Sequence, residues 1–341
     1  MYNLRTQHDL NTKAYLVDCK QRMINYLRVS ITDRCNLRCI YCMPEEGVQF
    51  MPRDEILTYE EMLRLVSLCA QHGVKKVRLT GGEPLVRKDI IPFIEKLRCI
   101  HGLEEITLTT NGVLLKEFAG DLRKVGISRI NVSMDTLKPE RYYRIARRDC
   151  FEKVWEGIEE AESAGFQPVK INVVVMRGVN DDEILDFARL TYKKSYHVRF
   201  IEIMPVGARN LWTPERFLSV EEILGKIRCL GPVTPLDSNP LDGPAQRYVL
   251  EGARGEIGVI GAITHPFCRK CNRLRLTAEG YLKGCLFSDS ETDVRTPLRQ
   301  GKGDNHLLKL ITNTILNKPR NHGLDIYGPR ESVRSMNSIG G

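Results

Sequence analysis

Residues 34–44 read Arg-Cys-Asn-Leu-Arg-Cys-Ile-Tyr-Cys-Met-Pro, with three and then two residues between Cys35, Cys39 and Cys42. Three thiols this close cannot all pair with one another, so in a reducing compartment they indicate ligands of one soft metal centre. An iron–sulfur cluster usually takes four cysteines, and a run that supplies three leaves one iron open to a ligand that is not protein. A structural zinc site is the alternative, because zinc also uses short Cys-x2-Cys arms.

The same stretch resembles the signature of the radical S-adenosylmethionine (SAM) superfamily. That signature has three cysteines with these two spacings and an aromatic residue before the last cysteine, the position that Tyr41 holds here. The resemblance implies a 4Fe-4S cluster whose open iron is chelated by the amino and carboxylate groups of SAM. Reductive cleavage of SAM would then yield a 5′-deoxyadenosyl radical.

The composition favours a large globular chain with an anionic ligand. Its 341 residues are 42% hydrophobic, and 51 Lys and Arg against 43 Asp and Glu give a net charge of +8. Such a charge suits a polyanion. Because like charges form no blocks and aromatics are not interleaved with Arg or Lys, a compact anion pocket fits better than a nucleic-acid surface. No signal peptide or membrane-spanning stretch is evident, so we expect a cytoplasmic protein with no membrane partner.

Short β-rich runs alternate with longer amphipathic runs, which predicts the α/β fold class. The predicted strands cover residues 26–31, 76–80, 105–109, 129–133, 169–176 and 197–203, and the predicted helices cover residues 59–72, 90–97, 114–125, 151–164 and 182–193. Such alternation indicates right-handed βαβ units and a parallel sheet, either open or closed into all or part of a barrel. By resemblance to radical SAM enzymes, we expect a partial (six-stranded) βα barrel.

We expect four regions along the chain. An N-terminal arm covers residues 1–24, and the partial barrel covers residues 25–205. Residues 206–327 contain a stretch rich in Pro and Gly and two strand-like pairs at 248–260 and 274–282, which predict a smaller C-terminal lid that carries a second cluster. Residues 328–341 are polar and end in Gly340 and Gly341, which indicates a flexible tail.

Several motifs follow the C-terminal ends of predicted strands, where a βα barrel carries its active site. Gly81-Gly82-Glu83-Pro84 offers a backbone that a ligand can approach closely and a carboxylate that can accept from an ammonium group, although alone it is only a tight turn. In radical SAM enzymes a similar motif holds the amino group of SAM. The resemblance implies SAM contacts at Tyr41, Gly82, Glu83, Ser133 and Met204.

A second group of cysteines comprises Cys268, Cys271 and Cys285. A zinc ribbon would normally present two Cys-x2-Cys arms, and here the second arm is a single cysteine. We therefore favour a second 4Fe-4S cluster with one open iron. His265 could complete a zinc site, and that alternative stays open.

Basic residues occupy predicted strands in positions that share an inner wall. Arg273 and Arg275 are two residues apart and so face the same side of their strand, as do Lys76 and Arg78. Arg forks bind phosphate in a bidentate manner. Each of these side chains alone is more simply solvated or salt-bridged, but together with Arg28, Lys170 and Arg199 they predict a basic cavity.

The resemblance then narrows to the GTP 3′,8-cyclase family of molybdenum-cofactor biosynthesis. It is carried by residues 109–112, 198–205 and 267–287 and by the terminal glycines, and it covers nearly the whole chain from Tyr26 onward. It implies a SAM-dependent lyase in which the adenosyl radical removes the C3′ hydrogen of GTP and the ribose radical attacks guanine C8. The product would be (8S)-3′,8-cyclo-7,8-dihydroguanosine 5′-triphosphate, an early intermediate of molybdopterin synthesis.

The same resemblance implies roles for individual residues. The first cluster would be held by Cys35, Cys39 and Cys42, and the second, which binds the purine, by Cys268, Cys271 and Cys285. GTP would be bound by Arg28, Lys76, Arg78, Thr109, Lys170, Arg199, Arg273, Leu274 and Arg275. Catalysis would involve Arg273, Arg275, Gly340 and Gly341, with the tail inserted into the active site.

The expected partners follow from this chemistry. They are GTP as substrate, an external electron donor of the flavodoxin or ferredoxin type, and a downstream pterin synthase that receives the product, with the oligomeric state open between monomer and homodimer. A related radical enzyme acting on a peptide would share the SAM chemistry, but the basic strand residues speak against it. A zinc-stabilised binding or electron-transfer module would bind no SAM and would leave Tyr41 and the Gly-Gly-Glu run as coincidences.

Overall fold

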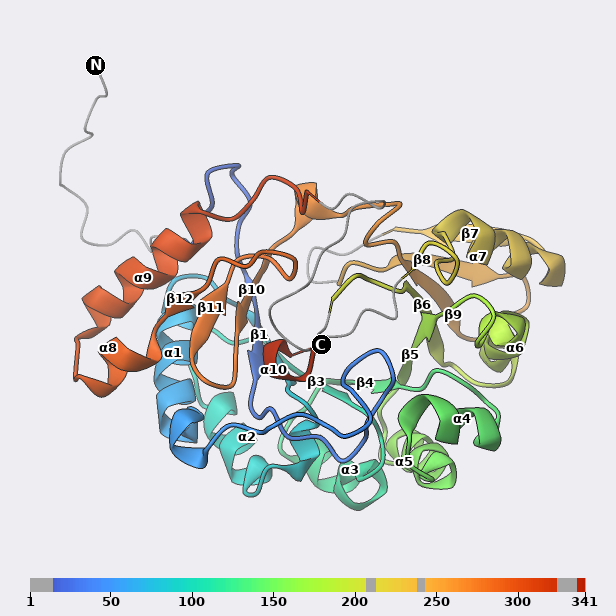
Figure 1. Ribbon diagram of the computed structural model, residues 1–341, viewed down its shortest axis with the longest axis horizontal. Coiled ribbons are helices and arrows are strands. Elements are labelled where there is room, and N and C mark those ends of the chain that lie inside the picture. The colour runs from blue at the N-terminus through green and yellow to red at the C-terminus, as the bar shows by residue number, and fades with distance from the viewer. Residues whose placement is uncertain (1–14, 207–212, 238–242, 324–335, 341) are drawn as a thin grey trace.

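The computed structural model describes residues 15–206, 213–237, 243–323 and 336–340. Residues 1–14 of the predicted arm, and residues 328–335 and Gly341 of the predicted tail, lie outside these ranges. Six parallel strands stand side by side in chain order, which confirms the predicted α/β barrel (Figure 1). They are β1 (Tyr26–Ser30), β2 (Lys76–Thr80), β3 (Glu105–Thr110), β4 (Arg129–Ser133), β5 (Lys170–Val175) and β6 (His197–Glu202).

Helices between these strands form the outer layer of the barrel (Figure 1). Those that the sequence predicts are α1 (Tyr59–Gln71), α2 (Ile90–Arg98), α3 (Leu115–Lys124), α5 (Phe151–Ser163) and α6 (Ile184–Lys193). The first begins at a capping box, in which Thr58 accepts from Glu61 N and the Glu61 carboxylate accepts from Thr58 N. The sequence pattern misses α4 (Pro139–Ala146), because eight residues give too short a period to recognise.

The C-terminal region adds strands to both edges of the barrel sheet. β10 (Arg273–Leu276) pairs in parallel with β1, and β9 (Glu256–Ile260) pairs in parallel with β6. Antiparallel pairing continues the two edges through β11 (Tyr281–Lys283), β12 (Thr292–Asp293), β8 (Gln246–Leu250) and β7 (Val233–Leu236). Within the described ranges the sheet therefore has 12 strands, and the predicted C-terminal lid shares backbone hydrogen bonds with the barrel.

The remaining elements are short or belong to the C-terminal region. The helices are α7 (Val220–Ile227), α8 (Arg295–Arg299), α9 (Asp304–Leu316) and α10 (Met336–Ile339). Single turns of 3-10 helix occur at Arg53–Glu55, Pro84–Val86, Asp181–Glu183, Arg228–Leu230 and Cys268–Lys270. No helix among the described residues is long and apolar enough to cross a bilayer.

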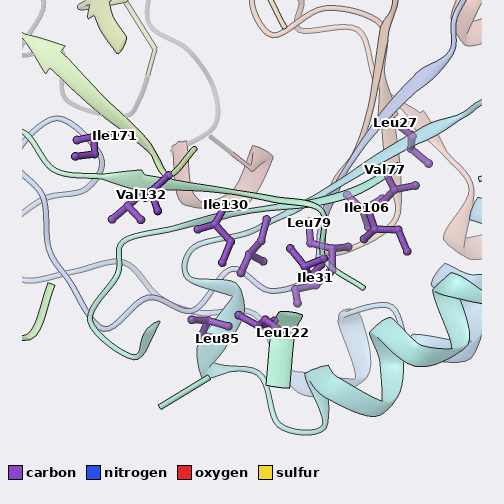
Figure 2. Packing of buried hydrophobic residues seen from close by; sticks show 14 of the residues in the cluster. Leu27, Ile31, Val77, Leu79, Leu85, Ile106, Leu122, Ile130, Val132 and Ile171 are labelled. Carbon is purple, nitrogen blue, oxygen red and sulfur yellow. The ribbon is translucent and has the colours of Figure 1, made fainter. Parts of the chain in front are cut away.

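Each barrel strand has one apolar face and one more polar face. Figure 2 shows the apolar set packed against the helical layer, with Leu27, Val77, Ile106, Ile130 and Ile171 contributed by β1 to β5. Burying each such side chain contributes about 1.5–3 kcal/mol, which fixes the strand register. Because side chains alternate along a strand, the residues between them, such as Arg28, Arg78 and Asn131, must face the barrel interior.

The described part of the N-terminal arm packs against the barrel. Leu16 and Ile24 are buried, and a β-bridge joins Val17 to Met23. Leu16 N donates to the carbonyl oxygen of His72 at 3.0 Å, which fastens this arm beside the end of α1. Residues 15–24 are thus part of the folded body, and the exact boundary of the predicted arm stays a prediction.

Candidate active site

A cavity of about 290 Å³ lies inside the barrel, at the C-terminal ends of its strands. Both cysteine groups line it: Cys35, Cys39 and Cys42 from the loop after β1, and Cys268, Cys271 and Cys285 from the C-terminal region. Its remaining wall is formed largely by the inward-facing residues of the strands. Two groups more than 200 residues apart in the sequence therefore open into one chamber.

The first cysteine group lies in the loop that leaves β1. Ile40 N donates to the carbonyl oxygen of Ile145 at 2.9 Å, which fastens the loop to α4. Burial raises the pKa of Cys35 to about 11 and that of Cys39 well above its usual value, and the neighbouring thiols add to the shift of Cys39. The thiolate forms therefore need a positive partner, which the iron of a cluster supplies.

Four of the predicted SAM residues line the cavity, namely Tyr41, Gly82, Ser133 and Met204. At Gly82 an added Cβ would lie 2.3 Å from the carbonyl oxygen of Arg34, so the backbone approach there excludes any side chain. The hydroxyl of Tyr41 donates to Asp135 Oδ2 at 2.6 Å, and Asp135 Oδ1 accepts from Val174 N at 2.8 Å. Tyr41 is thereby held against the ends of β4 and β5.

The fifth predicted SAM residue, Glu83, has a different environment. Its carboxylate is fully buried and accepts from Leu85 N, Thr110 Oγ1 and Asn111 N at 3.0, 2.8 and 2.6 Å. Burial raises the pKa of Glu83 to about 7 against the effect of these donors. Glu83 does not line the cavity but joins the loops after β2 and β3, and its contact with SAM stays a prediction.

The second cysteine group lies in strongly cationic surroundings. Burial alone would raise the pKa of Cys271, yet Arg273 and Lys318 lower it to about 6. Burial also raises the pKa of Cys268, and the other two thiols of the group contribute to that shift. The three thiols are thus close enough to influence one another, and the nearby cations favour an anionic occupant.

The donor set fits iron–sulfur clusters by its chemistry. All 11 cysteines are free. Within the described residues, no three His, Cys, Asp or Glu side chains are arranged as ligands of a single metal ion. A cubane binds each thiolate at a different iron, so its cysteines need not converge on one point. The fit therefore rests on two sets of three free thiols in one cavity.

A basic wall runs across neighbouring strands of the barrel. Arg28 on β1 lies in register with Arg275 on β10 and with Arg78 on β2. Burial alone would raise the pKa of Tyr26, yet four nearby arginine and lysine side chains lower it to about 7. A phenol that ionises this easily reports a strongly positive interior, which suits a polyphosphate.

The structure brings only some of the predicted GTP residues onto the cavity. Those that line it are Arg28, Arg78, Thr109, Arg199, Arg273 and Arg275, and Arg78 Nη1 donates to Thr109 Oγ1 at 3.2 Å. Lys76 instead forms a buried ion pair with Glu105 at 3.0 Å, and Leu274 belongs to the hydrophobic core because it points to the opposite face of β10. Lys170 is buried without lining the cavity. The GTP contacts of Lys76, Lys170 and Leu274 stay predictions.

The last described residue of the chain lies beside this wall. Arg275 Nη1 donates to the carbonyl oxygen of Gly340 at 2.8 Å, and Figure 1 shows α10 next to β1. Gly340 has a φ of +72°, and a Cβ there would lie 2.5 Å from Thr80 Oγ1. Both features require glycine. The predicted catalytic partner Gly341 lies outside the described residues.

Sequence reasoning missed several polar residues of the cavity. Asn131 and Asn172 line it, and each has a buried Oδ1 atom with no hydrogen-bond partner among the described residues. Both could have been found from the alternation of side chains along a strand. Asn131 lies two residues before Ser133, and Asn172 lies two residues after Lys170. Lys318, which lies beside the second cysteine group but does not line the cavity, was also missed, because a lysine just after a helix is ordinary.

Two family models match the chain in succession. Residues 29–191 match the radical SAM superfamily, and residues 196–324 match Molybdenum Cofactor Synthesis C. The boundary between them falls just before β6, so the sixth strand of the barrel lies in the second match. The second match contains all three cysteines of the second group.

Relatives match over almost the whole length. The GTP 3′,8-cyclase of Heliobacterium modesticaldum is 47% identical, with 96% of this chain and 100% of the relative covered. That of Thermodesulfovibrio yellowstonii is 49% identical, with 94% and 98% covered. The chain belongs to the GTP 3′,8-cyclase family. Family membership confirms the predicted radical SAM enzyme of molybdenum-cofactor biosynthesis, with SAM and a 4Fe-4S cluster as cofactors.

Solved structures support the same fold for this GTP 3′,8-cyclase family member. Streptococcus suis SuiB bound to the precursor peptide SuiA matches with a TM-score of 0.63 at 14% identity, covering 95% of this chain and 74% of SuiB. SuiB bound to S-adenosylmethionine matches with a TM-score of 0.57 at 14% identity, covering 81% and 64%. At this identity the likeness concerns the radical SAM fold alone.

Proposed function

We propose that the chain cyclises GTP to (8S)-3′,8-cyclo-7,8-dihydroguanosine 5′-triphosphate, an early step of molybdenum-cofactor biosynthesis. In this reaction the C3′ hydrogen of the ribose is removed, C3′ bonds to guanine C8 as the C8=N7 double bond opens, and N7 gains one electron and one proton. The observation that carries the proposal is the single cavity into which both cysteine groups and a wall of arginines open. The names of the relatives support GTP as the substrate.

The first cysteine group would hold the cluster that binds SAM. When bound, this cluster and SAM supply a 5′-deoxyadenosyl radical after one-electron reduction. The chain's own part is to position SAM: Gly82 offers bare backbone beside Arg34, and Ser133 and Met204 line the same chamber. Glu83 keeps the loops after β2 and β3 together around that place.

The second cysteine group would hold a second 4Fe-4S cluster that binds the purine. Arg273 stands beside this group, with its guanidinium 4.7 Å from the ring centroid of Phe267. The triphosphate would lie against Arg28, Arg78 and Arg275, whose in-register spacing presents several guanidiniums to one anion. Fixing both ends of GTP in this way would leave the ribose between the two cysteine groups.

Burial of the arginines would make triphosphate binding strong and selective. Burial, together with Arg78 and Arg273, lowers the pKa of Arg28 to about 10, although Tyr26 opposes the shift. An anion that arrives between such cations relieves both their mutual repulsion and the cost of their desolvation. The interior of the partial barrel would also limit the access of water and other hydrogen donors to a radical.

We further propose that the protein works in the reducing cytoplasm and receives electrons from an external donor. Reductive cleavage of SAM consumes one electron and reduction of the cyclised nucleotide radical consumes a second, and the donor would be of the flavodoxin or ferredoxin type. The 11 free cysteines support a reducing compartment. The cyclic product would pass to a downstream pterin synthase, since the reaction leaves a pterin still to be formed.

Anaerobic reconstitution tests the proposal. The chain should carry about eight iron atoms, about four for each cluster, and should convert GTP but not ATP into a new nucleotide in the presence of SAM and dithionite. GTP should change the electron paramagnetic resonance spectrum of one cluster only. A chain that binds zinc, or holds about four irons, or ignores GTP would contradict it.

A further inference from the structure

Lys318 is a buried lysine just beyond the end of α9, and only 4% of it is exposed. Its Nζ donates to the carbonyl oxygen of Arg273 at 2.9 Å and to that of Gly284. The thiol of Cys271 lies close enough to this ammonium group for their charges to interact. An ammonium group has three donors, so the two carbonyl oxygens leave one donor for the cysteine side.

The two carbonyl acceptors belong to separate parts of the second cysteine group. Arg273 follows Cys271 by two residues, and Gly284 directly precedes Cys285. One ammonium group therefore joins the turn that carries Cys271 to the strand end that carries Cys285. Gly284 packs closely here, since an added Cβ would lie 3.4 Å from Lys318 Cα.

The surroundings of Nζ lack the usual partner of a buried lysine. Among the described residues, the hydrogen-bond acceptors of Nζ are two carbonyl oxygens, with no carboxylate. A buried ammonium is costly unless an anion compensates it, and here only the cysteine side supplies one.

The residues after Lys318 serve the same group. The backbone N–H of His322 donates to the thiol of Cys268. Arg22, from the N-terminal arm, donates to the carbonyl oxygens of Cys268 and Pro319 at 2.7 and 2.9 Å. Residues 318–322 therefore contact each cysteine of the second group, or a residue close to it in the sequence.

We propose that Lys318 is a positioning residue of the second 4Fe-4S cluster, which it holds in place and tunes by donating to the Cys271 sulfur. This inference rests on the proposed function, because that function includes the second cluster. A hydrogen bond and a positive charge at a ligating sulfur stabilise the reduced, more negative state of a cluster, and so raise its reduction potential. Lys318 does not line the cavity, so it acts through the cluster rather than on GTP.

The test compares Lys318→Met with Lys270→Gln in anaerobically reconstituted enzyme. Lys270 is exposed and directly precedes Cys271, so its substitution removes the same charge from the same turn without the buried contact. The readouts are iron per chain, 5′-deoxyadenosine formed without GTP, and the midpoint potential of each cluster by redox titration. The third variant, Lys318→Arg, keeps the charge.

We expect K318M to change the ratio of reduced to oxidised second cluster at least tenfold at a given potential, a shift of 59 mV or more to lower potential for a one-electron couple. The first cluster and K270Q should keep their potentials, and K318R should lie nearer the wild type. An unchanged second potential in K318M, or an equal shift in K270Q, overturns the proposal.

A measurement on the unmodified chain covers the case in which K318M does not hold its cluster. Enzyme labelled with ¹⁵N at lysine Nζ should show a nitrogen coupling to the reduced second cluster in electron–nuclear double resonance. Absence of that coupling refutes the role of Lys318 and does not affect the proposal of a second cluster. About four irons per wild-type chain refute the second cluster itself, and Lys318 as its positioning residue with it.

Discussion

Arg275 donates from Nη1 to the carbonyl oxygen of Gly340 at 2.8 Å, which joins the strand beside the second cysteine group to the last described residue of the chain. Burial lowers the pKa of Arg275 well below its usual value, and the neighbouring Arg28 and Arg273 lower it further. A carbonyl oxygen compensates part of that cost. The end of the chain thus orients a guanidinium of the basic wall.

Gly340→Ala should reduce GTP cyclisation at least tenfold, about 1.4 kcal/mol of transition-state stabilisation. The added methyl would lie 2.5 Å from Thr80 Oγ1, and a φ of +72° is strained for alanine, so the tail must shift away from Arg275. The measurement is chromatography of the nucleotide product under anaerobic conditions, with 5′-deoxyadenosine followed in parallel. Deleting Gly340 and Gly341 together should abolish turnover while iron content stays the same.

Gly303→Ala is the matched control for the tail. Gly303 has a φ of −70° and no atom within 4 Å of an added Cβ, so alanine fits there without strain. Turnover of this variant should equal that of the wild type. Full activity of Gly340→Ala and of the deletion would show that the contact with Arg275 does not matter for the reaction.

Arg78→Ala should weaken GTP binding about tenfold to hundredfold, since hydrogen bonds of a charged group contribute about 1.5–3 kcal/mol each. Arg78 stands in register beside Arg28 and donates to Thr109 Oγ1. Anaerobic calorimetry measures the GTP affinity, and 5′-deoxyadenosine formed without GTP measures the first cluster. Equal losses in the two readouts would argue against a triphosphate role.

Arg64→Ala is the control for Arg78→Ala. Arg64 pairs with Asp304 at 2.8 Å on the surface, where the two side chains are 39% and 59% exposed. Such pairs contribute little to stability and lie away from the cavity. GTP affinity and SAM cleavage should both match the wild type in this variant.

The barrel could be predicted because its strands carry a strong local signal. Alternation of apolar and polar residues, as in the run around Arg28 and the run around Arg78, marks both the strand and the face that each residue takes. The pairing of β10 with β1 could not be predicted, because it joins Leu27 to Leu274 across nearly 250 residues. No local sequence pattern indicates which distant strand will pair with a given strand. The sequence therefore predicts a smaller lid built onto the barrel and does not show that its strands extend the barrel sheet.

The candidate site also has a part that the sequence predicts and a part that it does not. Cysteine spacing is local, so both thiol groups were visible in the sequence. The environment of Glu83 was not visible in the sequence, because its donors Thr110 and Asn111 come from the next strand and the loop after it. The environment of Lys318 was not visible either, because its hydrogen-bond acceptors come from two separate segments. Hydrogen-bond partners that depend on tertiary packing leave no trace in residue spacing.

Arg22→Met should lower the free energy of unfolding by about 3–5 kcal/mol, which is the usual cost of leaving one member of a buried ion pair without its partner. Arg22 and its partner Asp18 are 7% and 0% exposed, and Arg22 also donates to the carbonyl oxygens of Cys268 and Pro319. The variant should lose iron from the second cysteine group before the first. Anaerobic thermal unfolding and iron counting give the two measurements.

Arg64→Met is the corresponding surface control, and it should cost less than about 1 kcal/mol. A double substitution, Asp18→Asn with Arg22→Met, should recover part of the lost stability, because it removes the uncompensated carboxylate as well. An Arg22→Met variant with wild-type stability and full iron would mean that the arm does not support the second cysteine group.

His197→Gln should remove the contribution of His197 to the pH dependence of stability between pH 7 and 5. Burial and the nearby cations lower the pKa of His197 to about 4 from its usual 6.5, although Glu256 opposes the shift. Between these values the unfolded chain binds the proton and the folded chain does not, so lowering the pH from 7 to 5 should destabilise the wild type by about 2 kcal/mol through this group. The comparison is the free energy of denaturant unfolding of the two proteins at both pH values. Exposed His101, as His101→Gln, should keep the wild-type slope, and the same slope in His197→Gln would disprove the assignment.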